Sequence, residues 1–350
     1  MTAELACPLT AIPAPARPVA GGKAAALGEL AAAGLPVPPG YVVTTAAFRR
    51  ALAEIDPDQA IPAAIERLSG DDPGAVQAAA AQARHRILAA PVPAAVADAV
   101  TSCYRDLGSP PVAVRSSATG EDSAAASFAG LADTYLWVQG EEAVTGHVRR
   151  CWASLYSAES VSYRRHQRLP EAGLAMAVVV QEMLEPRCAG VMFTRSPVTG
   201  DPSVIVVEAS WGLGSALVSG DVTPDEFVVS KVTGQIVRRT VASKLRQHQR
   251  DPAGSGVLVA GVPPQRRDQP CLTDDEIQAL ARLGRRISEH YGCPQDIEWA
   301  ALDTGEGTAA RLAVLQSRPE TVWSRRQPGP AGEPRARPVD HVLDWLRGSR

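Results

Sequence analysis

The chain has 350 residues, of which 45% are hydrophobic and 21% are charged, and its formal net charge is −3 at pH 7. This length accommodates two or three packed units, and this composition is typical of a soluble globular protein. The slightly acidic balance argues against a general nucleic-acid binder, because such a protein needs clustered Lys and Arg to bind phosphates.

The cysteines and the N-terminus indicate the compartment. The six cysteines are scattered, without a C-x-x-C pair and without His at metal-ligand spacing, so they predict neither a zinc site nor a disulfide framework. The N-terminus lacks a basic region followed by an apolar run, and no stretch of 18 apolar residues occurs. We therefore expect a cytoplasmic protein with reduced thiols and with no membrane or nucleic-acid partner.

The first candidate functional residue is Lys23. The segment VAGGK at residues 19–23 opens a predicted helix that ends at Gly34. A lysine at the N-terminal end of a helix is unfavourable for the helix dipole unless an anion lies nearby. Lys23 is therefore a candidate anion ligand, and the alternative is a solvated lysine at a helix start.

A second candidate is the stretch PVAVRSSATGEDSAAASFAG at residues 111–130. It predicts a short apolar strand with Arg115 at its exit, followed by a run of Ser, Thr, Gly and Ala. Small residues let backbone N–H groups approach an anion closely, and the fork of donors on Arg suits phosphate. The stretch predicts a phosphate-binding loop, and the alternative is a flexible surface loop after an ordinary strand.

The remaining segments predict a scaffold. Thr45 is the expected N-cap of a helix that follows a strand at 41–44, and residues 56–107 read as Ala-rich helices. A strand at 134–138 and one helix at 144–165 follow. Four strand-like runs predict a mainly antiparallel sheet, at 177–181, 190–194, 203–209 and 226–230. Residues 249–270 read as a loop, and Thr273 is expected to cap a helix with a continuous apolar stripe.

The last predicted element is a hairpin between residues 297 and 316. If its turn lies midway, Glu298 is opposite Gln316 and Asp296 is opposite Arg318, and alternation places all four on one face. Such a set of polar groups is costly to bury empty. The face is suited to Mg²⁺ bridging polyphosphate oxygens, with the guanidinium on the phosphates, and the alternative is an exposed polar hairpin face.

Several long motifs, in order and spacing, closely resemble one family: GGKAAALGEL, VAVRSSATGEDSAAASFAGLADTYL, VVVQEML, AGVMFTRSPVTGD, ASWGLGSALVSGDVTPDEFVVSK and LAVLQSRPETVW. It is the N-terminal nucleotide-binding domain of phosphoenolpyruvate synthase and pyruvate phosphate dikinase, which is also found in rifamycin phosphotransferases. The resemblance implies an α+β, ATP-grasp fold, in which two lobes with mainly antiparallel sheets close on ATP. The expected lobes are residues 1–185 and 186–323, followed by a tail at 324–350 whose short amphipathic run could dock on a partner.

Carried over residue by residue, the resemblance implies three groups of ligands. Those for the ATP phosphates are Lys23, Arg115, Gly130, Thr134, Asp296 and Arg318. The catalytic residues among them are Lys23, Arg115 and Arg318. The strand that meets adenine through backbone groups consists of Gln181, Glu182 and Met183. The Mg²⁺ ligands are Glu298 and Gln316.

Two departures from the family shape the functional expectation. Relatives often carry Glu where this chain has Ser215, which puts any role of that acid in doubt here. The multidomain enzymes of the family also contain a swivelling phosphohistidine domain and a substrate domain, and neither is found in this sequence. We therefore expect an ATP-binding kinase component that transfers a phosphoryl or pyrophosphoryl group to a histidine on a separate swivelling-domain protein. The alternatives are a direct small-molecule kinase and a non-catalytic ATP-binding module.

Overall fold

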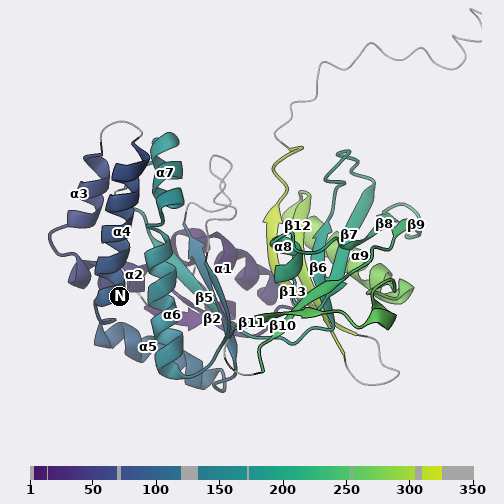
Figure 1. Ribbon diagram of the computed structural model, residues 1–350, viewed down its shortest axis with the longest axis horizontal. Coiled ribbons are helices and arrows are strands. Elements are labelled where there is room, and N and C mark those ends of the chain that lie inside the picture. The colour runs from purple at the N-terminus through teal and green to yellow at the C-terminus, as the bar shows by residue number, and fades with distance from the viewer. Residues whose placement is uncertain are drawn as a thin grey trace, which may run out of the picture.

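The computed structural model describes residues 4–13, 15–68, 72–119, 133–171, 173–252, 254, 256–303 and 310–324. In this part of the chain, two antiparallel sheets stand side by side, each with its own helices (Figure 1). The structure is therefore α+β, as the sequence predicts. The predicted tail lies outside the described residues from 325 onward.

The first sheet has five antiparallel strands in the order β1-β2-β5-β3-β4. They are β1 (Ala6–Pro8), β2 (Gly40–Val43), β3 (Val112–Ala118), β4 (Thr134–Val138) and β5 (Met176–Glu182). The helices on one face are η1 (Leu9–Ala11) and α1 (Ala16–Ala32). Those on the other are α2 (Thr45–Ile55), α3 (Ala60–Glu66), α4 (Pro73–Ala89), α5 (Ala94–Asp106), α6 (Glu141–Ser154) and α7 (Ala158–His166). The central strand β5 is apolar on both sides because Val178 and Val179 pack in different cores.

Helix α1 is broken at Gly21, which has a φ of 72°. A Cβ at this position would lie 2.1 Å from the carbonyl oxygen of Ser117, so only glycine lets α1 touch β3 here. The side chain of Ser117 fastens the contact, since its Oγ donates to the Ala20 carbonyl at 2.8 Å and accepts from the Ala24 N–H at 3.2 Å. The break places Lys23 in the first turn of the longer segment of α1.

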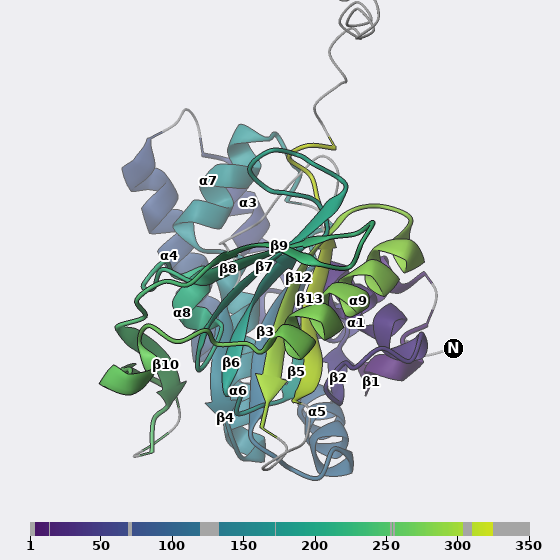
Figure 2. The same ribbon diagram turned by 90° about the vertical axis from the view of Figure 1, so that its right-hand side faces the viewer.

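The second sheet has six antiparallel strands in the order β13-β12-β6-β7-β8-β9. They are β6 (Cys188–Phe193), β7 (Val204–Trp211), β8 (Asp225–Ser230), β9 (Ile236–Thr240), β12 (Gln295–Leu302) and β13 (Arg311–Pro319). The other elements of this half are α8 (Ser215–Val218), the hairpin of β10 (Arg246–Arg250) and β11 (Val257–Gly261), and η2 (Pro264–Arg266). Helix α9 (Asp274–Tyr291) crosses one face of the sheet (Figure 2).

The predicted helix after Thr273 is confirmed. Thr273 and Glu276 form a reciprocal capping box, and Gly292 ends the helix in the left-handed conformation. The predicted apolar stripe is buried against the second sheet through Ile277, Leu280, Ala281, Leu283, Gly284 and Ile287.

Three predictions about the scaffold of the first half are wrong. Arg115 lies in the middle of β3, because the strand continues through the buried Ser116 and Ser117 to Ala118. The predicted long helix is two helices, α6 and α7, and Ser157 caps the second through a bond from the Ser160 N–H. The N-cap of α2 is Thr44, and the hydroxyl of Thr45 donates instead to the Pro18 carbonyl.

Two predictions about the strands are also wrong. The run at 177–181 belongs to the first sheet, where β5 pairs with β2 and β3, and the other three runs belong to the second. The segment predicted as a loop at 249–270 contains most of the hairpin of β10 and β11. The strands of this hairpin are short and exposed, with Val257, Leu258 and Val259 each more than a third exposed, so their pattern does not resemble that of a core strand.

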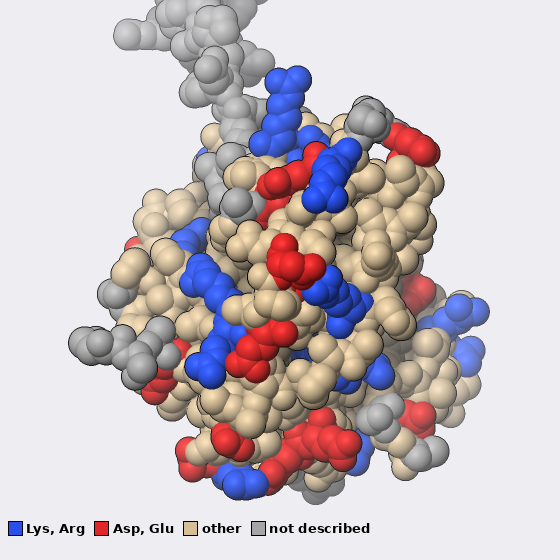
Figure 3. All heavy atoms as spheres, turned by 90° about the vertical axis from the view of Figure 1, so that its left-hand side faces the viewer, with Lys and Arg blue, Asp and Glu red and all other residues tan. Residues whose placement is uncertain are grey.

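The helical face of the first half mixes positive and negative side chains (Figure 3). Exposed ion pairs on the helices of the first half include Arg50 with Glu54 and Arg105 with Glu141. Among the described residues, no single helix has the length and apolar composition to cross a membrane, although α4 and α5 pass that test when taken together across their 73° bend.

A pair of carboxylates gives the second sheet a pH-dependent stability. Glu208 lies directly opposite Glu226, and burial and this neighbouring charge raise the pKa of its carboxyl. A raised pKa means that ionisation costs more in the folded than in the unfolded chain. The contribution of Glu208 to the free energy of unfolding therefore falls as pH rises past the usual pKa range of Glu. We expect Glu208→Gln to raise the melting temperature at pH 7 and to have little effect near about pH 3.5. Calorimetry across this pH range measures the difference, and a gain independent of pH would contradict the explanation.

Candidate functional site

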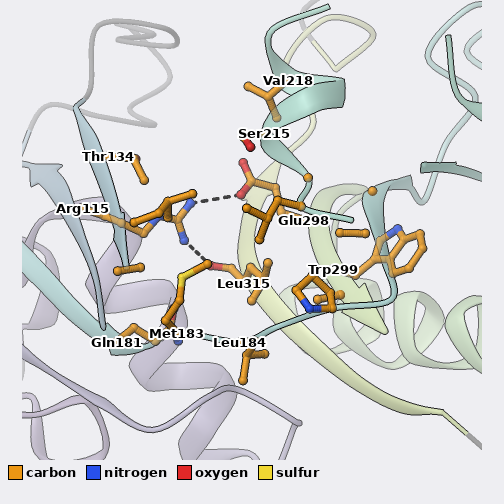
Figure 4. A pocket seen from close by; sticks show the side chains of 18 of the residues that line it. Arg115, Thr134, Gln181, Met183, Leu184, Ser215, Val218, Glu298, Trp299 and Leu315 are labelled. Atoms are coloured by element: carbon orange, nitrogen blue, oxygen red, sulfur yellow. Dashed lines mark hydrogen bonds and ion pairs between the residues drawn. The ribbon is translucent and has the colours of Figure 1, made fainter. Parts of the chain in front are cut away.

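A cavity opens between the two sheets, where β3, β4 and β5 approach β6, β12 and α8 (Figure 4). Residues predicted from the sequence that line it are Arg115, Thr134, Gln181, Glu182, Met183 and Glu298. Much of the remaining lining is apolar and includes Leu136, Leu184, Leu213, Val218, Ala300 and Leu315. A concave, mainly apolar cavity with a few convergent polar groups is typical of a small-molecule site.

Arg115 is the central polar group of the cavity. Its side chain is only 11% exposed and reaches from β3 to the hairpin of the other sheet. Nη1 donates to the Leu315 carbonyl at 2.6 Å. Nη2 donates to Glu298 Oε2 at 3.0 Å and to Gln316 Oε1 at 2.8 Å. Nε is buried and makes no hydrogen bond to a described residue.

The predicted register of the hairpin is confirmed. Glu298 is paired with Gln316, and Asp296 is paired with Arg318, whose Nε lies 3.3 Å from Asp296 Oδ2. A bulge follows Glu298, and the turn at 304–309 lies outside the described residues. Glu298 and Gln316 meet at Arg115, and Asp296 and Arg318 lie two pairs further along the strands. Of these four residues, only Glu298 lines the cavity.

Lys23 lies next to the cavity without lining it. Its Nζ donates to the carbonyl oxygen of Ser116 at 3.2 Å, and the residue is only 7% exposed. Since Ser116 follows Arg115 in β3, the structure brings these two predicted phosphate ligands to neighbouring positions on the first sheet.

Thr134 begins β4 and pairs with Arg115 across the β3–β4 ladder. It lines the cavity from the first sheet, on the side opposite Glu298 (Figure 4). The other residue predicted for this loop, Gly130, lies outside the described residues, together with the rest of 120–132.

The end of β5 contributes the backbone of the cavity floor. The Glu182 N–H donates to the Pro39 carbonyl at 2.8 Å, and the Met183 N–H donates to the Pro111 carbonyl at 2.9 Å. The Gln181 side chain points away to the Pro38 carbonyl, 3.1 Å from its Nε2. These two N–H groups are therefore already bonded and are not available to a ligand at this end.

One contact at the edge of the cavity is not predicted from the sequence. Ser215 lines the cavity and lies within hydrogen-bond distance of His248, at 2.9 Å. Their proximity depends on how β10 packs on the loop before α8, and no local pattern in the sequence signals it.

Metal ligands are few in this region. Among the described residues, no group of three or more His, Cys, Asp or Glu side chains is arranged to hold a metal ion. Mg²⁺ commonly binds through one or two protein oxygens and completes its shell with phosphate and water. The oxygens of Glu298 and Gln316 fit such a site, because both accept from the same nitrogen of Arg115 and therefore already converge on one positive charge.

Comparison with known proteins identifies relatives along most of the chain. Residues 17–337 match the family model described as pyruvate phosphate dikinase, AMP/ATP-binding domain. The chain is 42% identical over 310 residues to the probable phosphoenolpyruvate synthase of Methanothermobacter thermautotrophicus. The aligned region covers 87% of this chain and 44% of that protein. The chain is 45% identical over 304 residues to a rifampicin phosphotransferase from a Streptomyces species, and this alignment covers 86% of the chain and 34% of that relative.

A phosphoenolpyruvate synthase from Aeropyrum pernix is 40% identical over 340 residues, which covers 89% of this chain and 41% of that protein. The chain therefore spans less than half the length of these three relatives. Since the family model covers nearly the whole chain, the chain belongs to the pyruvate phosphate dikinase AMP/ATP-binding domain family.

Proposed function

We propose that the chain binds ATP in this cavity and is the kinase component of a phosphoenolpyruvate synthase-like, dikinase-type phosphotransferase. Its fold in this proposal is ATP-grasp, with residues 1–185 and 186–323 as the two lobes. The observation that carries the proposal is the position of Arg115, whose guanidinium from the first sheet meets Glu298 and Gln316 of the second. A cation, a carboxylate and an amide oxygen converge there at the polar end of a mainly apolar cavity.

The two ends of the cavity suit the two ends of ATP. The segment from Gln181 to Met183 lies at one end, where backbone carbonyl oxygens would accept from the adenine amino group. Arg115 and Glu298 lie at the other end, where the phosphates would be bound (Figure 4). Lys23 would add a second cation from the adjacent turn of α1.

Phosphoryl transfer requires positioning and neutralisation of charge more than covalent chemistry by the protein. Arg115, Lys23 and Arg318 would supply fixed positive charge to the phosphates. Glu298 and Gln316 would hold Mg²⁺, which when bound screens the charge of the phosphate oxygens. On ATP binding, Arg115 would release the Glu298 carboxylate and bind a phosphate oxygen instead, because guanidinium N–H groups pair with carboxylate and phosphate in the same geometry.

We further propose that the acceptor is a histidine on a separate protein with a swivelling domain. The described lining of the cavity contains no histidine. The acceptor would then enter from outside, and its imidazole nitrogen would attack a phosphorus atom of ATP. Attack at the β-phosphorus releases AMP, and attack at the γ-phosphorus releases ADP.

The test is to incubate the chain with ATP and Mg²⁺, alone and with a candidate swivelling-domain protein. We expect nucleotide turnover and a phosphorylated histidine only in the mixture, and the product, AMP or ADP, identifies the transferred group. A partner with its histidine replaced is the matched control, and it should bring turnover back to the level of the chain alone.

The same experiment separates the alternatives. Equal turnover with and without the partner, accelerated by a small acceptor, would support a direct small-molecule kinase instead. Binding of ATP without turnover under any of these conditions would support a non-catalytic module. Failure to bind ATP at all would contradict the proposed site.

A further inference from the structure

The end of the cavity near Glu298 carries a hydroxyl group whose partner lies outside the cavity. Ser215 is the first residue of α8 and lines the cavity together with Glu298 (Figure 4). Its Oγ lies 2.9 Å from Nδ1 of His248, a residue of β10 that is only 8% exposed. The proposed ATP chemistry assigns no role to this buried imidazole.

The backbone fixes the two residues relative to each other. Gly212 has a φ of 75°, and a Cβ there would lie 2.3 Å from the carbonyl oxygen of His248. Because no side chain is present, the loop approaches β10 closely, and the Leu213 N–H donates to the same carbonyl oxygen at 2.8 Å. The loop that carries Ser215 is therefore attached to the strand that carries His248, independently of their side chains.

The other ring nitrogen of His248 faces a carboxylate. Nε2 is buried and lies 3.3 Å from Asp221 Oδ2, in a contact that is not aligned as a hydrogen bond and is therefore electrostatic. Asp221 is held in place by the hydroxyl of Ser219, which donates to the same oxygen at 2.5 Å. A carboxylate favours an N–H on the ring nitrogen that faces it, so we assign the proton of a neutral His248 ring to Nε2, which leaves Nδ1 as an acceptor.

This tautomer determines the direction of the Ser215 bond. The hydroxyl has to donate its proton to Nδ1, because that nitrogen offers only a lone pair. Ser215 Oγ then presents only lone pairs to the cavity, where it accepts hydrogen bonds without donating one.

We propose that His248, oriented by Asp221, is a positioning residue that fixes the Ser215 hydroxyl as an acceptor for a ribose hydroxyl of the bound nucleotide. The inference rests on the proposed ATP site and adds a contact for the sugar to it.

The chemistry of ATP selects the ribose. Phosphate oxygens are acceptors, and an oxygen that can only accept repels them. The adenine amino group is a donor, but its proposed position is at the opposite end of the cavity, near Met183 and Leu184 (Figure 4). The two ribose hydroxyls are the remaining donors of ATP, and they adjoin the phosphate end of the cavity, where Ser215 lies beside Glu298.

The test compares nucleotides that differ by one hydroxyl. Binding of a non-hydrolysable ATP analogue and of its 2′-deoxy and 3′-deoxy forms is measured by calorimetry with Mg²⁺ and the full chain. The wild type is expected to bind one deoxy form about three- to tenfold more weakly than the ribose form, which is the range of a single hydrogen bond. Ser215→Ala is expected to bind this deoxy form and the ribose form equally well.

Two matched variants of His248 separate positioning from packing. Asn places an amide oxygen near the position of Nδ1 and keeps an acceptor for Ser215, whereas Gln places its amide near Nε2 and keeps only the contact toward Asp221. We expect His248→Asn to retain the preference for ribose and His248→Gln to lose it. The reverse order would overturn the positioning role, and Ser215→Ala still decides the ribose contact if either variant does not fold.

The outcomes distinguish this inference from the function on which it rests. If the wild type binds the ribose form and both deoxy forms equally, the ribose contact is wrong and the ATP site stands. If Ser215→Ala weakens the ribose form and both deoxy forms by the same factor, the ribose contact is also wrong. If none of the three nucleotides binds, the proposed function fails together with this inference.

Discussion

Replacement of Arg115 with Met is expected to weaken ATP binding by about 100-fold and to strengthen the binding of Mg²⁺ in the absence of nucleotide. The loss follows from the removal of charge-assisted hydrogen bonds to phosphate, each worth about 1.5–3 kcal/mol. The gain follows because the guanidinium bonds to Glu298 and Gln316, the proposed Mg²⁺ ligands. Without it, the Glu298 carboxylate is left to attract the metal ion.

Calorimetric titrations with the ATP analogue and with Mg²⁺ alone measure both effects. Arg105→Met is the matched control, because Arg105 pairs with Glu141 on the exposed surface and should change neither affinity. A variant of Arg115 that binds Mg²⁺ more weakly than the wild type would show that Glu298 and Gln316 are not the metal ligands. Unchanged ATP binding would remove Arg115 from the phosphate site.

Replacement of Asp225 with Ala is expected to destabilise the second half of the chain by about 3–5 kcal/mol. Asp225 and Lys244 are both fully buried, and Lys244 Nζ donates to Asp225 Oδ1 at 2.5 Å. The carboxylate also accepts from the backbone N–H groups of Ala242 at 3.0 Å and Cys271 at 2.8 Å. The substitution leaves a buried ammonium without its counter-ion and two backbone donors without an acceptor.

Urea denaturation followed by tryptophan fluorescence measures this loss. The double variant with Lys244→Met should recover part of the stability, because it no longer buries an unpaired charge. Glu226→Ala is the control at the next position of β8, and its partly exposed pair with Arg238 predicts a change below about 1 kcal/mol. A loss of that small size for Asp225→Ala would show that the buried pair does not stabilise the fold.

The hairpin of β12 and β13 is the part of the site that the sequence predicts best. Its two strands are neighbours in the chain, so the alternation of polar residues and the place of the turn determine which residues face each other. The pairing of Glu298 with Gln316 and of Asp296 with Arg318 follows from that local rule and is found in the structure. The helix after Thr273 is similarly predictable, because its cap and its apolar stripe lie within one segment.

Contacts between distant segments could not be predicted in the same way. The apolar run of β5 resembles the runs of β6 and β7, and only its pairing with β2 and β3 assigns it to the first sheet. The contact between Ser215 and His248 depends on a strand with exposed apolar residues and on a glycine that lets two backbones meet. Local periodicity carries no information about such packing, because the energy that selects it comes from residues far apart in sequence.

Helix α1 packs against both halves of the molecule. Ala20, Ala24 and Leu27 pack against the first sheet, whereas Leu30 belongs to the core of the second. A rotation of one sheet relative to the other would therefore be taken up where α1 meets the second half, at the contact of Leu30, because Ala20, Ala24 and Leu27 share one core with the first sheet. Because Lys23 stands between Ala20 and Ala24 and its ammonium bonds to Ser116, it would stay in place on the first sheet during such a rotation, so Lys23 and Arg115 would move as one unit relative to Glu298.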